Sequence, residues 1–418
     1  MKKGLIMLAA FIIFILSYKE GSLIPQSREI DELEFVRAVA LDKGMNNQMR
    51  VSVLLKKEKQ SSSSAGGGDS GGGDDGESEI ITGEGNTAFS TQSFFESYSD
   101  KSLFYGHAEY ILIGEDAAKE DMRKYTDFVT RDHEYRLTAH VYITKGKAED
   151  ILTSSKTFLP DKLRILYKNI KELSISDELP LIELVSKLED NQLYAIAVPM
   201  VKTYEEASME DQNKNQQSSQ GGQQSGGQGA GAAVQKTKEI ALGGFAIIKD
   251  FHLIGFLDDT LARAYCFATN RVGSGSIDVL DQTGNYVGLE VLQSGTQIIP
   301  RVEDGKLTGV TIKTVFQTNV DEIHSTENIF QEERIKYIES EQSDVIKKEI
   351  ESLIRFAQEN KADFMGIGQA ISMAHPIIWK DYESNWPEFF STLDIGVQVE
   401  SKVARSYNIN EPIGNKEY

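Results

Sequence analysis

Hydrophobic positions in the first half of the chain switch repeatedly between a spacing of two and a spacing of three or four. A spacing of two predicts strands, and the longer spacing predicts helices with one apolar face. Residues 35–44 and 48–57 are predicted to form a hairpin that turns at 44–47. Further strands are expected over 79–82, 102–115, 136–146 and 193–203, and helices over 87–99, 116–136, 148–155, 161–174 and 179–189. The mixture predicts an α+β fold, with mixed or antiparallel sheets flanked by helices.

The second half predicts more strands, followed by one long helix. Two strands are expected within 239–258, a short helix over 258–269 and a meander over 274–320. Apolar residues then recur every three or four positions across 328–360, which predicts a long amphipathic helix. A last strand is expected over 392–404.

Two stretches carry almost no residues that could bury surface. Residues 60–79 are rich in Gly, Ser and acids, and residues 206–237 contain a long Gln, Gly and Ser tract. Such compositions predict flexible coil, because ordering them costs backbone entropy without apolar gain. We expect the first to be an enlarged hairpin loop and the second to separate domains. The expected divisions are a signal-like or anchor segment over 1–25, an N-terminal α+β domain over 26–205, a linker over 206–237, a middle β-rich domain over 238–300 and a C-terminal α+β domain over 301–408.

The N-terminus has the order of a secretory signal. Lys2 and Lys3 precede an uncharged apolar run from Leu5 to Leu16, and Lys19 and Glu20 follow it. The run is shorter than the ~20 residues that span a bilayer comfortably, and no clear signal-peptidase site follows. The sequence leaves open whether this segment is cleaved or stays as an anchor. It predicts membrane association through the N-terminus.

Composition narrows the classes of partner. The chain has 418 residues, with 64 acidic and 44 basic side chains and a formal net charge of −20. This charge repels phosphate backbones, so no nucleic-acid partner is expected. Cys266 is the only cysteine, so no intramolecular disulfide can form, and we expect it to be a small buried apolar residue.

The sequence offers no convincing catalytic, cofactor or metal site, and we predict no residue for any of the three. The six histidines, at positions 107, 133, 140, 252, 324 and 375, lack metal-ligand spacing. His133 begins an H-E pair, but Leu137 stands where a zinc protease needs a second imidazole. No G-x-S-x-G motif occurs outside the Gly- and Ser-rich stretch over 60–79. The chain is therefore not expected to be an enzyme or to need a cofactor.

Three short motifs have both a structural and a functional interpretation. The segment GEGNTA, with Gly83, Gly85 and Ala88, could cradle pyrophosphate but is interpreted as a strand-to-helix turn. GIGQA at 366–370 is a weaker match of the same kind. Trp379 and Trp386 could offer an aromatic shelf to a sugar or peptide, but are expected to pack onto the core.

Several ordered motifs together resemble the Ger(x)C family of spore germination proteins, the C subunits of nutrient germinant receptors. In the first half these motifs are REIDELEFVRAVALDKG, the segment from GEGNTA to GEDAA, and Arg131 and Asp132 followed by LTAHVYITKGKAEDIL. In the second half they are GGFAIIKDFHLIGFLDDT and ENKADFMGIGQAISMAHPIIWKDY. The resemblance covers nearly the whole folded chain. It also identifies GEGNTA as a family turn.

The resemblance implies a non-enzymatic subunit at the outer, extracytoplasmic face of the inner spore membrane. Its implied partners are an integral-membrane A subunit and a transporter-like B subunit. Family members normally carry a lipid-modified cysteine before the segment equivalent to REIDELEF, but YKEGSLIPQS stands there in this chain. An uncleaved segment from Leu5 to Leu16 is our hypothesis for its replacement.

Two other functions stay open at this point. The first is an extracytoplasmic module that binds a small nutrient in a concave pocket with a few convergent polar groups. The second is a cell-wall hydrolase, which would need a catalytic constellation. The sequence does not identify the germinant, the interface residues or the oligomeric state.

Overall fold

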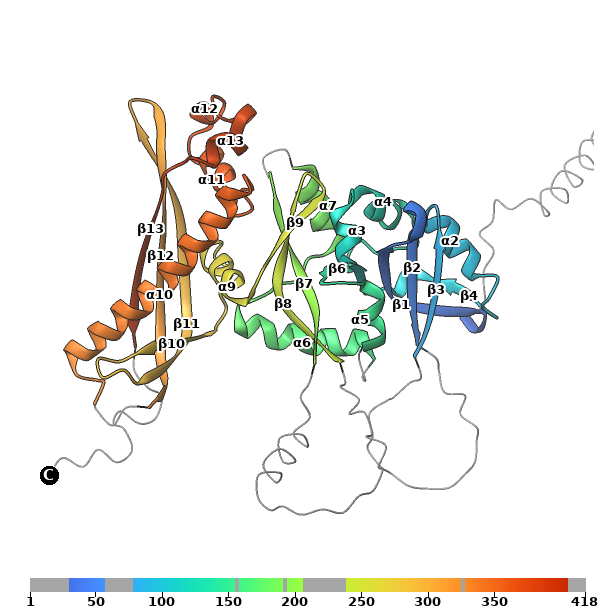
Figure 1. Ribbon diagram of the computed structural model, residues 1–418, viewed down its shortest axis with the longest axis horizontal. Helices are drawn as coiled ribbons and strands as arrows, with labels where there is room; N and C mark the ends of the chain where they lie inside the picture. The colour runs from blue at the N-terminus through green and yellow to red at the C-terminus, as the bar shows by residue number, and fades with distance from the viewer. Residues whose placement is uncertain are drawn as a thin grey trace, which may run out of the picture.

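Two β-sheets organise the protein in the computed structural model (Figure 1). The structure describes residues 30–56, 78–154, 158–190, 194–205, 238–324 and 328–404. The first sheet has nine strands, in the order β3-β2-β1-β5-β6-β7-β8-β9, with β4 paired to β1. The second has four strands, in the order β10-β11-β12-β13. The predicted α+β class with helices flanking mixed sheets is confirmed.

The first sheet starts from the predicted hairpin. Strands β1 (Leu33–Lys43) and β2 (Met49–Lys56) pair antiparallel, and β3 (Ser78–Gly85) adds the outer edge. The central strands β5 (Tyr110–Ile113), β6 (His140–Thr144) and β7 (Ile196–Glu205) continue the sheet parallel to β1. Parallel neighbours need crossover connections, and the intervening helices provide them.

Helices cover both faces of this sheet because its central strands are apolar on both sides. Val39 and Leu41 of β1 lie in one buried cluster, and Ala38 and Ala40 lie in another. The first cluster is covered by α2 (Ala88–Phe95), α3 (Glu115–Lys119), α4 (Arg123–Arg131) and α7 (Leu181–Glu189). The second is covered by α5 (Ala148–Ser154) and α6 (Leu159–Leu173). Both faces of the sheet are therefore buried, as expected for parallel strands.

Two predicted elements are divided in the structure. The strand expected over 102–115 becomes β4 (Ser102–Phe104), a short 3-10 turn η3 (Tyr105–His107) and β5. The helix expected over 116–136 divides into α3 and α4, because the backbone of Glu120 is extended. The Glu120 carboxylate then accepts hydrogen bonds from Tyr125, at 2.6 Å, and from Lys124, at 3.4 Å. Tertiary contacts thus override the local periodicity in both places.

Strands β8 (Lys238–Lys249) and β9 (His252–Leu257) complete the first sheet. Lys238 pairs with Glu205 at the end of β7, just as Ser78 pairs with Lys56. Residues 57–77 and 206–237 therefore each connect neighbouring antiparallel strands, although the sequence favoured a domain boundary at the second. Their expected flexibility lies outside the described residues. Strands from 238–300 divide between the two sheets, and the domain limits stay a prediction.

The second sheet is built around a long hairpin. Strand β11 (Tyr286–Glu303) pairs antiparallel with β10 (Ser276–Leu280) and with β12 (Lys306–Ile323). Asp304 and Gly305 form the turn with φ of 50° and 75°, which suits a two-residue hairpin with left-handed positions. The helix expected over 328–360 corresponds to α10 (Glu332–Glu359), which crosses over to β13 (Ile395–Val403). Strand β13 consequently runs parallel to β12.

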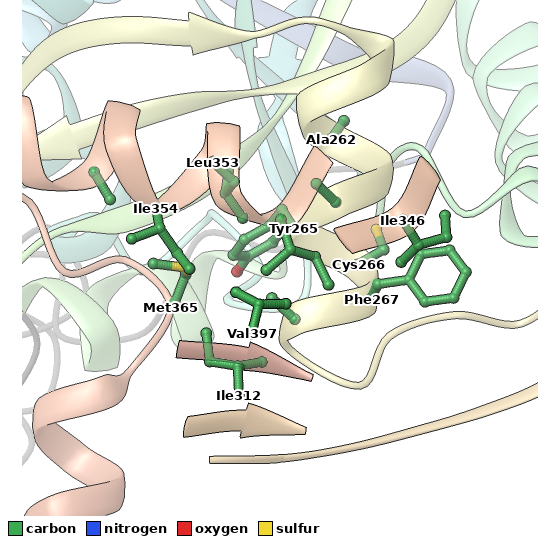
Figure 2. Packing of buried hydrophobic residues seen from close by; sticks show 14 of the residues in the cluster. Ala262, Tyr265, Cys266, Phe267, Ile312, Ile346, Leu353, Ile354, Met365 and Val397 are labelled. Atoms are coloured by element: carbon green, nitrogen blue, oxygen red, sulfur yellow. The ribbon is translucent and has the colours of Figure 1, made fainter. Parts of the chain in front are cut away.

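A third apolar cluster joins the two sheets. Helix α9 (Asp259–Ala268) contributes Tyr265, Cys266 and Phe267, which Figure 2 shows among side chains of α10 and the second sheet. Phe245 and Leu257 of the first sheet belong to the same cluster. Both sheets contribute to this core, and helix α9 contacts strands of both of them. Within the described ranges, no helix combines the length and the apolar character needed to cross a bilayer.

Candidate functional site

A cleft of about 380 Å³ lies where the two sheets meet. The start of β7 forms one wall, the end of α9 and the middle of β11 form a second, and α11 (Ile367–Ala374) forms a third. Its apolar lining includes Phe364 and Met373, and its polar lining includes Asn270, Thr296 and Gln369. A few polar groups in a largely apolar depression are typical of a small-molecule site.

The chain turns sharply at the end of α9 to build the second wall. Asn270 has a φ of 61°, a left-handed conformation that asparagine tolerates better than most residues. Its Oδ1 accepts a hydrogen bond from the Thr296 N–H at 3.3 Å, which ties α9 to β11. The Arg271 N–H then donates to the Cys266 carbonyl at 2.8 Å. These bonds hold in one place the polar rim of the cleft, which consists of Asn270, Arg271 and Thr296.

Arg271 connects the rim of the cleft to the loop between α6 and α7. Its guanidinium forms an ion pair with Asp177 and lies 6.0 Å from the centre of the Tyr265 ring. Burial opposes the arginine charge, but Tyr265 and Asp177 outweigh it and raise the pKa of Arg271. Burial also raises the pKa of Tyr265 to about 12, so its hydroxyl is neutral at physiological pH. The rim thus presents a fixed cation beside a neutral phenol.

A buried carboxylate fixes the third wall. Asp363 accepts hydrogen bonds from the N–H groups of Ile367, at 3.0 Å, and Gly368, at 2.7 Å, at the start of α11. Its second oxygen also accepts from the Trp386 indole N–H at 3.0 Å. Burial raises the pKa of Asp363, and the three hydrogen bonds act against that rise. A single side chain thereby ties α11 to α13 (Trp386–Phe390).

The GIGQA motif and the two tryptophans form one packed unit. A Cβ on Gly368 would lie 2.8 Å from the Trp379 ring and 2.9 Å from the Trp386 nitrogen, so only glycine fits without a shift. Trp379, in α12 (Pro376–Trp379), and Trp386 are both buried. Packing onto the core is therefore what the structure shows for them. The aromatic shelf for a sugar or peptide is absent.

The GEGNTA segment is a tight turn between β3 and α2. Thr87 caps the helix, and its hydroxyl accepts a hydrogen bond from the Ser90 N–H at 3.1 Å. A Cβ on Gly83 would lie 2.8 Å from the Phe95 ring, so this glycine lets α2 pack against its own strand. Strand β3 is antiparallel and lies at the sheet edge. A dinucleotide-binding βαβ unit needs a parallel neighbour at this point.

The histidines do not come together as metal ligands. Among the residues that the structure describes, no group of three His, Cys, Asp or Glu side chains could hold a metal ion. His107 and His140 line one cavity of about 190 Å³ with Glu109, Glu178 and Arg164. His140 Nδ1 lies 4.0 Å from the Glu178 carboxylate, and the His107 ring stacks on Phe35. His133 stays exposed beside Asp132.

Comparison with known families covers both halves of the chain. Residues 26–203 match the model described as spore germination protein N-terminal domain. Residues 243–407 match the model described as spore germination B3/GerAC like, C-terminal. The two models follow each other in the order that the sequence motifs predicted. The chain belongs to the Ger(x)C family.

Relatives and a solved structure agree with this membership. Spore germination protein KC of Bacillus subtilis (strain 168) is 22% identical over 401 residues, 92% of this chain and 92% of the relative. Spore germination protein B3 of the same organism is 22% identical over 387 residues, covering 90% and 92% of the two chains. The crystal structure of the GerBC protein matches with a TM-score of 0.53 at 18% identity, covering 90% of this chain and 99% of that one. At this identity the structure match shows the fold.

Sequence reasoning did not find the cleft of this Ger(x)C protein. Its lining comes from several elements whose contacts depend on long-range pairing, and each lining residue is ordinary by itself. Asn270 and Gly366, both at left-handed positions, are the weak local signals that mark its walls.

Proposed function

We propose that this chain is a non-enzymatic, membrane-tethered subunit of a spore nutrient germinant receptor. It acts at the outer face of the inner spore membrane through contacts with the membrane A and B subunits. The observation that supports this most is the match of both halves to the germination family models over 26–203 and 243–407. The buried Asp363 accepts hydrogen bonds that join helices to one another. A structural use of this buried carboxylate agrees with a protein that acts through contacts with other proteins.

The tether in this proposal is the N-terminal segment itself. The run from Leu5 to Leu16 follows two lysines, and the only cysteine, Cys266, lies far along the chain, so no thiol near the segment can carry a lipid. N-terminal sequencing of protein from spore membranes tests this. An intact N-terminus supports the tether, whereas a membrane-free protein that starts beyond Ser22 contradicts it.

The receptor role is tested with spores that lack this gene. Nutrient-triggered dipicolinate release is measured, with a non-nutrient trigger as the control. A loss of dipicolinate release that is confined to some nutrients supports a role of the protein in one receptor. Unchanged release with every nutrient contradicts a specific role for this chain in nutrient sensing.

The cleft supports a second candidate function, the binding of a small nutrient. Its volume of about 380 Å³ falls within the range of small-ligand pockets. Equilibrium dialysis with the nutrients that trigger dipicolinate release tests this candidate. If the protein retains a nutrient and the Asn270→Ala variant retains less of it, binding at the cleft is supported. If the protein retains none of the triggering nutrients, this candidate function is contradicted.

A further inference from the structure

Helix α2 exposes an aromatic face. Phe94 and Tyr98 are 54% and 69% exposed, whereas Ala88 and Phe95 of the same helix are buried. Phe89 is also 64% exposed, but it points about 140° away from Phe94 around the helix. Its ring lies against Phe128 of α4, with the ring centres 6.2 Å apart. The rings of Phe94 and Tyr98 are in edge contact, with their centres 4.9 Å apart. Isolated apolar residues are common on protein surfaces, but two exposed aromatic rings in contact with each other form a small apolar patch.

The chain that leads to the N-terminal apolar segment leaves the fold beside this helix. Just after α2, the Ser99 hydroxyl donates to the Glu34 carboxylate at 3.2 Å, and Ser102 pairs with Leu33 at the start of β1. Ile30, the first described residue, is 74% exposed. Residues 17–29 can span at most about 45 Å. Figure 1 shows α2 at the end of the molecule opposite the four-stranded sheet.

We propose that the aromatic face of α2, formed by Phe94 and Tyr98, lies in the headgroup region of the bilayer that holds the N-terminal segment. Tyr98 suits this region because its ring is apolar and its hydroxyl can stay in water, and phenylalanine is common on the buried side of helices that lie in the membrane interface. The inference rests on the proposed tether. It adds that the folded part is oriented on the membrane by a second contact.

The charges around the face indicate how it binds. Glu96, Asp100 and Lys101 are exposed close by, so the surface carries mixed charge with an acidic excess. Attraction to anionic lipid is therefore not the source of binding. Insertion of aromatic rings works on zwitterionic lipid and changes little with salt, unlike an ion-pair contact.

The test places a fluorescent probe beside the rings in the full chain. Ser97 is exposed between Phe94 and Tyr98, and its hydroxyl bonds the Phe94 carbonyl at 2.7 Å. Ser352 on α10 is a matched control, because it is also exposed and bonds the Lys348 carbonyl at 2.8 Å. Ser97→Cys and Ser352→Cys variants are labelled with an environment-sensitive fluorophore while Cys266 stays buried. Each is reconstituted in phosphatidylcholine vesicles that contain a shallow nitroxide lipid.

We expect the Ser97 label to shift to the blue and to lose about half of its emission to the nitroxide, with the Ser352 label unchanged. Adding Phe94→Ser and Tyr98→Ser should restore the emission expected in water, and Phe94→Trp with Tyr98→Trp should keep the quenching. An Ile377→Ser variant, changed at another exposed apolar side chain, should leave the Ser97 signal unaltered.

Other results overturn the proposal in distinguishable ways. A chain that sediments with the vesicles while the Ser97 label stays in water keeps the tether and removes the α2 contact. A blue shift that appears only with a membrane subunit present assigns the face to a protein partner. A chain that does not sediment with vesicles at all contradicts both the tether and the contact.

Discussion

Trp386 donates its indole N–H to Asp363 across 3.0 Å, and both side chains are buried. The same carboxylate holds the first N–H groups of α11, so one residue joins two helices that follow the long crossover helix α10. A buried carboxylate is tolerated only when hydrogen bonds compensate for its lost hydration. This contact therefore fixes the wall of the cleft that carries Gln369 and Met373.

Replacing Asp363 by Ala should destabilise the protein by about 3 kcal/mol, because three buried N–H groups lose their acceptor. Urea unfolding followed by tryptophan fluorescence measures the effect. Asp381→Ala, at an exposed position in the same region, is the control and should stay within about 0.5 kcal/mol of the parent. Equal stabilities for the two variants would contradict the role given to Asp363.

Gly368→Ala should cost about 2 kcal/mol, because the added methyl group meets two indole rings at less than 3.0 Å. A shift in tryptophan emission should accompany the loss. Gly295→Ala provides the comparison, since its added Cβ has no neighbour within 4 Å. The packing argument fails if the substitution at 368 is as neutral as that at 295.

Glu120 should make stability depend on pH in the acid range. Partial burial disfavours its charge, but Lys43, Tyr125 and Lys124 together lower its pKa from 4.5 to about 2. A lowered carboxyl pKa contributes stability above about pH 4.5 that is lost as the pH falls toward 2. The stability difference between the parent and Glu120→Gln should therefore shrink between pH 6 and pH 3, because pH 3 lies between the folded pKa of about 2 and the ordinary value of 4.5.

Asp116→Asn is the control for this titration, because its side chain is 78% exposed. Its stability difference from the parent should stay small at every pH. A Glu120→Gln difference that does not change with pH would show that the three partners do not favour the charged carboxylate.

Cys266 should be inert in the native protein. The thiol is 1% exposed, and burial raises its pKa to about 12. Reaction with a disulfide reagent at pH 8 should be about 100-fold slower than in denaturant, since thiolate and access are both required. The surface thiol of Ser352→Cys should react at once. Comparable native rates for the two thiols would mean that α9 opens readily.

Local periodicity predicted much of the fold because most elements have a clear apolar face. The β1–β2 hairpin and the helix α10 follow directly from residues such as Val39, Val51 and Ile350. The pairing of Glu205 with Lys238 and of Val310 with Ile395 was beyond such reasoning. These pairs are chosen by packing between distant segments, which leaves no local pattern.

The candidate site was less predictable than the fold. Gly368, Trp379 and Trp386 were recognised as separate weak motifs, but their contact with one another and with Asp363 depends on three helices meeting. The cleft combines ordinary residues from both halves, among them Ile196 and Gln369. Its chemistry is a property of the assembled structure.

The pairing of Glu205 with Lys238 has a consequence for proteolysis. A cut anywhere within 206–237 leaves β7 and β8 hydrogen-bonded in one sheet, so the two fragments stay attached without a covalent link. The nicked protein would migrate as two bands in a denaturing gel and sediment as one particle. We expect the same property to allow this Ger(x)C chain to be produced as two separately encoded pieces that reassemble.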